Sequence, residues 1–299
     1  MIKYLKIFLI MIFAISCESI VDVELPKQNP VIVVNSFFTP DSIWKVHVSK
    51  SMGILESFSS INEYGYYENK IPILENAKVE IWNGNNFVSN LNYAGNGYYT
   101  AVNTFPSANN NYKIVVSAEG FNSINADDEI PESVSIKDVL VEANSSNEYS
   151  VENNLTITFS DNGDTKNYYQ ISILAVENFE NNIYKYPLSF ESNDILIGES
   201  GILEDEEKTF YGNAAFFDDV IISGKEYKLK ISTYDINYFN KVYIVLSSLS
   251  ENLFKYLVSV KEQNESDDNP FAEPVFIHSN VQSGLGIFGG YSSSFYRIK

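Results

Sequence analysis

A short stretch near the end of the chain has the spacing of a dinucleotide-binding loop. Gly284-Leu285-Gly286-Ile287-Phe288-Gly289 reads G-x-G-x-x-G and follows the strand-like run VFIHSNV. In a nucleotide-binding unit such glycines open a helix within a βαβ unit of about 30 residues, and an acidic residue follows about 20 positions later. The segment after Gly289, GYSSSFYRIK, is predicted to be a strand and leaves no room for that unit. We therefore expect Gly284, Gly286 and Gly289 to permit tight bends beside apolar side chains, and we expect no cofactor.

Other groups that could act as acids, bases or nucleophiles are few in kind. The histidines are His47 and His278, both in strand-like runs, and no H-E-x-x-H, C-x-x-C or G-x-S-x-G pattern occurs. The usual carriers of zinc hydrolysis and α/β-hydrolase chemistry are therefore missing. A glycosidase needs only two carboxylates and 39 Asp and Glu are available, so a glycan hydrolase stays open as the least favoured hypothesis. We predict no catalytic residues and no enzyme.

Acidic loops raise the separate question of calcium, because oxygen-rich loops supply its usual ligands. The candidates are the DNGD turn at 161–164, Asp218-Asp219 and Asp267-Asp268. None matches D-x-[DN]-x-[DN]-G, and Asp and Asn in turns have a local hydrogen-bonding role. We predict no bound metal.

The first residues, MIKYLKIFLIMIFAISC, have the layout of a secretory signal. A short basic start with Lys3 and Lys6 precedes an apolar run that is too short for a permanent membrane span. The run ends in AISC, which resembles a bacterial lipobox, where cleavage precedes a lipid-modified cysteine. We expect a signal peptide over 1–16, lipidation at Cys17 and a lipid-anchored tether over 17–29. The alternative is a signal peptide followed by an incidental cysteine.

Composition indicates a globular β protein. Apolar residues make up 44% of the chain, and 21 Tyr and 20 Phe against 3 Met favour strands over helices. The formal net charge of -19 and the lack of a basic cluster oppose binding to a phosphate backbone. We therefore expect no nucleic acid partner.

Strand-like runs and turn residues divide the rest of the chain into two expected β-sandwich-like domains, 30–133 and 134–299. In the first, AKVEIWNG, GNGYYTAV and NYKIVVSAEGF have the spacing of an immunoglobulin-like or prealbumin-like sandwich, as in carboxypeptidase-regulatory-type domains. These positions have packing or turn explanations, so the similarity concerns the fold alone. In the second domain, alternation in LTITF, YYQISILAV and KEYKLKIST predicts another β-rich unit.

One α-helix is predicted in the C-terminal region, over about 249–262. Leu249, Leu253 and Leu257 follow helical spacing. Ser248 begins an S-x-x-E capping box that ends at Glu251. The apolar stripe predicts that this helix packs on the second domain, and the predicted fold class is mainly β.

The C-terminal stretch NPFAEPVFIHSNVQSGLGIFGGYSS resembles the closing motif of a Bacteroidota family of outer-membrane lipoproteins of unknown function. Members of that family are typically encoded beside TonB-dependent transporters. PVIVVNSFF, EIPESV, DNGDTKNYY and FFDDVIISGKEYKL are family-like segments in the expected order, so the resemblance spans the mature chain. The motif positions are Asn269, Pro270, Phe271, Glu273, Pro274, Asn280, Gly284, Gly286, Phe288 and Gly289.

The resemblance implies a cell-surface lipoprotein of the outer membrane that captures an unknown nutrient ligand for a TonB-dependent transporter. The competing hypothesis is an independent adhesin or structural surface lipoprotein. Tyr64, Tyr66 and Tyr67 lie in a polar, aromatic segment that would serve either role, because tyrosine offers amphipathic contact area. We name these three tyrosines as candidate ligand-binding residues.

Overall fold

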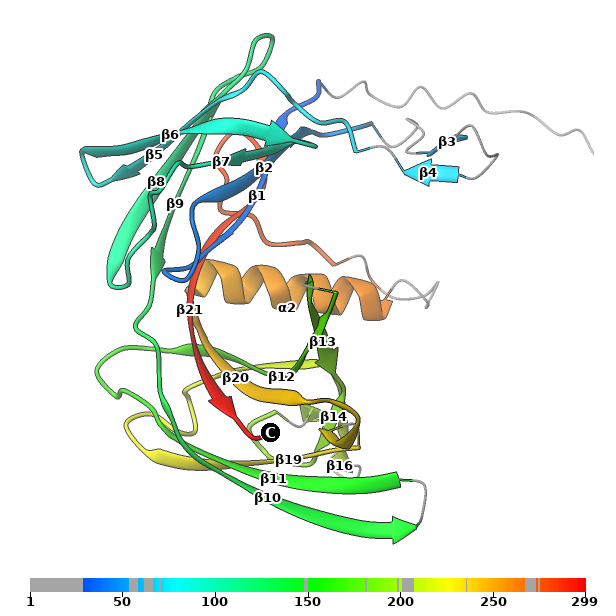
Figure 1. Ribbon diagram of the computed structural model, residues 1–299. Coiled ribbons are helices and arrows are strands. Elements are labelled where there is room, and N and C mark those ends of the chain that lie inside the picture. The colour runs from blue at the N-terminus through cyan, green and yellow to red at the C-terminus, as the bar shows by residue number, and fades with distance from the viewer. Residues whose placement is uncertain are drawn as a thin grey trace, which may run out of the picture.

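The computed structural model of the protein describes residues 29–53, 59–61, 67–69, 71–147, 150–180, 182–197, 199–200, 207–234, 236–266, 273 and 275–299. These residues form a mainly β structure with two large sheets and one α-helix near the C-terminal end (Figure 1). The predicted fold class is therefore confirmed. Within these ranges, no helix has the length and hydropathy needed to cross a membrane.

The larger sheet has 12 strands and runs through both halves of the molecule. Its spatial order is β13 (Asn182–Leu188), β12 (Tyr168–Phe179), β20 (Lys241–Leu249), β21 (Leu285–Arg297), β1 (Ile32–Phe38), β2 (Lys45–Lys50), β7 (Tyr98–Thr100), β6 (Asn86–Gly95), β5 (Lys78–Asn83), β8 (Asn110–Ser117) and β9 (Ile124–Ile130). The remaining strand, β18 (Ala214–Asp218), pairs with β12.

The second large sheet has five strands and covers a hydrophobic core, called the second core below, which includes Leu155, Ile173 and Leu188. Its order is β10 (Ile136–Asn147), β11 (Ser150–Ser160), β19 (Glu226–Thr233), β14 (Phe190–Ser192) and β17 (Phe210–Gly212). The other elements are β3 (Ser59–Ile61) with β4 (Tyr67–Asn69), β15 (Glu199–Ser200) with β16 (Glu207–Lys208), the short 3-10 helix η1 (Ile236–Tyr238) and the α-helix α2 (Glu251–Ser266).

Strands form where apolar and polar residues alternate, because successive side chains of a strand point to opposite faces. In β1, Ile32, Val34, Ser36 and Phe38 are buried, while the alternate residues between them are more exposed. The first core gathers around aromatic rings: Phe38 stacks on Phe288 with ring centroids 4.3 Å apart, and Trp44 lies 5.1 Å from Phe38. Phe288 comes from the C-terminal motif, so the last part of the chain completes the N-terminal core.

Strand β21 joins the two halves of the molecule (Figure 1). Its first part, Leu285 to Gly290, pairs in parallel with β1, and its second part, Tyr291 to Arg297, pairs antiparallel with β20. Strand β9 also contacts β21, and Asn125 forms an isolated β-bridge with Gln282. The predicted boundaries of 30–133 and 134–299 stay a prediction, but residues of the second range clearly complete the sheet of the first.

Helix α2 lies between the two halves, against β12 and β21 (Figure 1). Its buried Leu253 belongs to a cluster with Tyr168 and Ile287, and the ring of Tyr256 lies 6.0 Å from that of Phe37. The helix therefore packs on the second domain, as expected, and also contacts β1 of the first.

The cap of this helix differs from the predicted one. Ser250, not Ser248, is the N-cap, because its Oγ accepts a hydrogen bond from Leu253 N at 3.1 Å. Ser248 Oγ instead accepts from Val134 N at 3.3 Å, since Ser248 is still part of strand β20. The helix begins at Glu251 and extends to Ser266, later at both ends than the predicted range.

Candidate functional site

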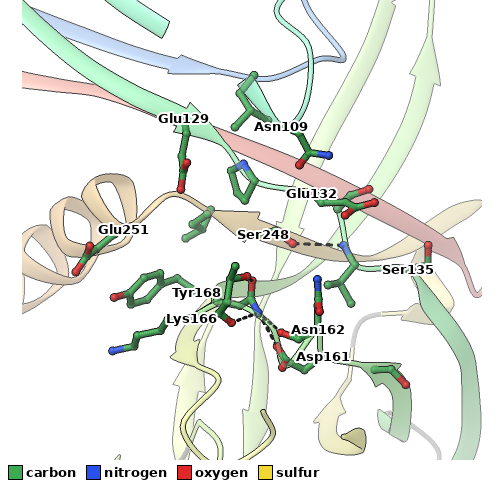
Figure 2. A pocket seen from close by; sticks show the side chains of 18 of the residues that line it. Asn109, Glu129, Glu132, Ser135, Asp161, Asn162, Lys166, Tyr168, Ser248 and Glu251 are labelled. Carbon is green, nitrogen blue, oxygen red and sulfur yellow. Dashed lines mark hydrogen bonds between the residues drawn. The ribbon is translucent and has the colours of Figure 1, made fainter. Parts of the chain in front are cut away.

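A polar cleft of about 800 Å³ opens where the connection between β9 and β10 faces the loop between β11 and β12 (Figure 2). The end of β20 and the first residue of α2 complete its wall. Its lining residues are Asn109, Asn111, Glu129, Ile130, Pro131, Glu132, Ser133, Val134, Ser135, Ser160, Asp161, Asn162, Thr165, Lys166, Asn167, Tyr168, Ser248, Leu249 and Glu251.

The buried carboxylate of Asp161 holds one wall of the cleft in place. Its Oδ1 accepts hydrogen bonds from Tyr169 Oη at 2.6 Å and from Asn167 Nδ2 at 3.2 Å, and its Oδ2 accepts from Gly224 N at 2.8 Å. Burial, and then the bond to Asp161, raises the pKa of the Tyr169 hydroxyl, which therefore stays protonated as a donor. Asp161 is also the first residue of the DNGD turn. Within that turn Asp164 N donates to Asn162 Oδ1 at 3.2 Å, which forms an Asx-type turn.

Asn167 connects this wall to the second acidic candidate. Its backbone N donates to Asp219 Oδ2 at 2.9 Å, and its side-chain amide also donates to the carbonyls of Asn162 and Thr165. The buried carboxylates of Asp161 and Asp219 are thus bonded to protein donors. Across the described ranges no group of three His, Cys, Asp or Glu side chains could hold a metal ion, and Asp267-Asp268 lies outside those ranges.

Two exposed charged groups of the cleft lining, Glu251 and Lys166, have charged partners. Glu251 and Lys255 form an ion pair at 2.9 Å, and Lys166 lies 3.5 Å from Asp218 and 5.0 Å from the ring centroid of Tyr168. Hydrogen bonding from Lys255, and then from Tyr168, lowers the pKa of Glu251. Among the described residues, the cleft lining contains neither His nor Cys, so this part of the lining offers hydrogen-bonding groups for a polar ligand and no histidine or thiolate to activate a nucleophile.

Asp128, which the sequence did not single out, connects three elements beside this cleft. It lies on β9 and is only 8% exposed. Its Oδ2 accepts from Ser250 Oγ and from Gly290 N at 2.9 Å, and its Oδ1 accepts from Asn252 Nδ2 at 3.2 Å. Burial raises the pKa of this carboxyl to about 6. The hydrogen bonds act in the opposite direction, and the one from Ser250 lowers the pKa most.

The histidines have packing roles in this structure. His278 N donates to Ser259 Oγ at 2.9 Å, and its Nε2 lies 3.1 Å from Asn252 Oδ1, so the segment before β21 is tied to α2. Burial, and then the charge of Lys255, lowers the pKa of His278. His47 stacks edge-on against Tyr98 with centroids 5.0 Å apart on the face of the first sheet.

The glycines of the C-terminal motif allow close backbone contacts. Gly286 has φ of 103°, and a Cβ there would lie 2.0 Å from the carbonyl oxygen of Val34. A Cβ at Gly284 would meet Ile32 O at 2.7 Å, and one at Gly289 would meet the side chain of Leu253 at 2.9 Å. These positions lie in or next to strand β21, so the G-x-G-x-x-G stretch does not open a helix.

Two residues of the C-terminal motif, Asn280 and Phe288, are joined by a hydrogen bond from Asn280 Nδ2 to Phe288 O. A third motif residue, Glu273, is exposed. Several other predicted residues lie outside the described residues: Cys17, Tyr64, Tyr66, Asn269, Pro270, Phe271 and Pro274. Tyr67 begins the short strand β4. Of the three candidate tyrosines only Tyr67 is described, and it is not among the residues that line the cleft. The part of the cleft that has a signal in the sequence is the DNGD turn at 161–164.

The fold and the cleft define a β-rich protein whose two halves share one strand and enclose a polar cleft beside their connection. The chain belongs to a protein family: the model for Domain of unknown function (DUF4249) matches residues 18–297. This confirms the predicted membership in a family of unknown function and covers all of the described residues except the last two. A comparison with curated proteins finds no match.

Proposed function

We propose that the protein is an outer-membrane lipoprotein, lipidated at Cys17 and exposed at the cell surface, that captures a nutrient for a TonB-dependent transporter. The secretory layout of residues 1–16 and the resemblance of the C-terminal motif support the location and the partner. In this role the protein binds and presents a ligand and is not an enzyme.

The observation that carries the binding role is the cleft at the junction of the two halves. Its volume of about 800 Å³ lies within the roughly 300–1,000 Å³ range of small-molecule sites. Its wall is fixed by Asp161, whose carboxylate oxygens accept hydrogen bonds from protein donors, so that the wall is already shaped without a ligand. Exposed polar groups such as Glu132 and Asn162 then remain to bind a polar nutrient.

Co-purification from solubilised outer membranes tests the proposal. The full-length protein carries a C-terminal affinity tag, and Cys17→Ala is the matched control. We expect the wild-type protein to fractionate with the outer membrane and to retain a TonB-dependent transporter, and we expect Cys17→Ala to lose membrane attachment. A membrane-attached protein that elutes without any transporter contradicts the partnership. A wild-type protein that needs no detergent to be extracted contradicts lipidation.

The second candidate function is an independent adhesin, and one observation favours it. Large apolar side chains are exposed on the hairpin of β12 and β13, including Phe179 and Ile183. Such exposed patches mark contact surfaces on folded proteins. Neighbouring genes discriminate the two functions: an adjacent transporter gene supports the accessory role, and adjacent surface-assembly genes support the adhesin.

A further inference from the structure

Three aromatic rings form a row at the edge of the larger sheet, away from the cleft. Tyr184 and Tyr186 on β13 have ring centroids 6.5 Å apart and planes that differ by 17°. Tyr186 continues the row to Phe239, just after η1, at 5.8 Å and 34°. Tyr184 and Tyr186 are 42% and 43% exposed, so their rings are accessible from solvent.

The row follows from strand alternation. Residues 184, 186 and 188 point to one face of β13. Leu188 is buried in the second core, whereas the two tyrosines lie beyond the part of that face that the core covers. Among the described residues, β13 is the edge strand of the 12-stranded sheet, and no further strand of that sheet pairs with its outer edge. Leu188 thus packs in the second core, whereas the rings of Tyr184 and Tyr186 do not.

A fixed carboxylate lies beside the row. Glu177 on β12 is the register partner of Tyr184, so both side chains lie on the same face of the hairpin. The backbone N of Asn240 donates to Glu177 Oε1 at 2.6 Å, and its Nδ2 donates to Oε2 at 2.9 Å. These bonds lower the pKa of Glu177 and keep it ionised. A carboxylate has about four acceptor positions, so roughly two stay open to a ligand.

We propose that the row of Tyr184, Tyr186 and Phe239, together with Glu177, binds the sugar rings of a neutral glycan chain. One face of a sugar ring is formed by C–H groups that pack on an aromatic ring, and its hydroxyl rim donates hydrogen bonds to a carboxylate. A row of rings matches successive sugars of a chain. The formal net charge of -19 disfavours polymers of acidic sugars. This inference does not rest on the transporter partnership.

The same geometry argues against two other occupants. A peptide strand added to β13 would need a regular row of backbone donors, but Pro187 lacks an N–H and Lys185 places a charge on the edge. A ligand cation is held best over the face of an aromatic ring, typically with several rings around it. Here the two tyrosine planes are close to parallel and succeed one another along the strand, which suits an extended chain better.

Affinity electrophoresis of the full-length protein in detergent tests this site. The gels contain one of three soluble neutral polysaccharides, a mixed-linkage β-glucan, a xylan or a mannan, and a polyuronate gel serves as the comparison. We expect at least one neutral polymer to retard the wild-type protein. The double variant Tyr184→Ala/Tyr186→Ala should bind about tenfold more weakly, while Tyr184→Phe/Tyr186→Phe, which keeps the rings, should bind as the wild type does.

Tyr211→Ala is the matched control, because Tyr211 is 71% exposed on β17, in the other large sheet. It should leave retardation unchanged, and melting temperatures should show that all of the variants fold. The proposal is overturned by any of three results. These are no retardation by the three neutral polymers, equal retardation of the double alanine variant, or retardation that choline abolishes but free glucose, xylose and mannose do not.

Discussion

The side chain of Asn280 forms a two-way hydrogen-bonded bridge with the backbone of Phe288. Asn280 Nδ2 donates to Phe288 O at 2.8 Å, and Asn280 Oδ1 accepts from Phe288 N at 3.1 Å. The same amide also donates to the carbonyl of Asp127 at 3.2 Å. Phe288 lies on β21 just before this strand changes its partner from β1 to β20. One asparagine therefore supplies the pairing that a neighbouring strand would otherwise give.

Replacing this asparagine should destabilise the whole protein. Asn280→Ala leaves the backbone N–H and C=O of buried Phe288 without their partners, and we expect a loss of about 1–3 kcal/mol in the free energy of unfolding. Urea unfolding measures it. Asn90→Ala, on an exposed position of β6, is the control and should change the stability by less than about 0.5 kcal/mol. Equal stabilities of the two variants would show that the bridge is not needed.

Gly286 should tolerate no side chain. A Cβ at this position would lie 2.0 Å from Val34 O, and its φ of 103° is outside the range of most L-residues. We expect Gly286→Ala to cost more than about 3 kcal/mol or to prevent folding. Gly84→Ala separates the two causes, because Gly84 has φ of 57° but open space around it, and should cost only about 1–2 kcal/mol. Thermal melting compares the two variants. A similar decrease in melting temperature for both would mean that β1 moves to relieve the close contact at residue 286.

Asp128 should make stability depend on pH. The pKa of about 6 in the folded protein lies above the ordinary 3.8, so the folded state holds the proton more tightly than the unfolded chain does. The contribution of this group to stability is fully present below pH of about 3.8 and is lost as pH rises through about 6. Between pH 4 and pH 7 the stability of Asp128→Asn relative to the wild type should therefore rise by roughly 2 kcal/mol.

Denaturant unfolding of both proteins across that range checks the prediction, because the difference cancels the other titrating groups. Asn90→Ala, a replacement of an exposed side chain that does not titrate, is the control and should show a flat difference. A flat difference for Asp128→Asn as well would contradict the raised pKa.

The helix cap can be tested by two serine variants. Ser250→Ala removes the acceptor of Leu253 N and the donor to Asp128, and should cost about 1–2 kcal/mol. Ser248→Ala removes one longer bond from Val134 N and should cost less. The melting temperatures rank them. The reverse order would support the cap predicted from the S-x-x-E pattern.

Local sequence patterns predicted strands and the helix of this fold but not the contacts between elements that are far apart in the sequence. Alternation predicted strands such as β11 and β19, and the spacing of Leu253 and Leu257 predicted α2, because both patterns depend on neighbouring residues. The choice of Ser250 over Ser248 depends on Asp128, which lies on another strand. A one-sequence pattern carries no information about such a partner.

The candidate sites show the same division. The glycine stretch lies in or next to strand β21, and its glycines permit close contacts there, in keeping with a role in backbone geometry. The cleft depends on how the loop at Asp161 faces the β9–β10 connection, which no periodicity encodes. Tyr184 and Tyr186 alternate in the sequence, and that alternation was a usable signal.

The pairing of Val33 with Leu285 joins residues from opposite ends of the chain. During synthesis, which proceeds from the N-terminus, β1 emerges long before the strand that it needs beside it. Until β21 arrives, Phe38 and Trp44 lack the ring of Phe288 that fills their core, and the edge of β1 is open. The contact order of this pair is high, so closure of the N-terminal half should be a late and slow folding event. A truncated chain that lacks only β21 would therefore expose an incomplete sheet to quality-control proteases.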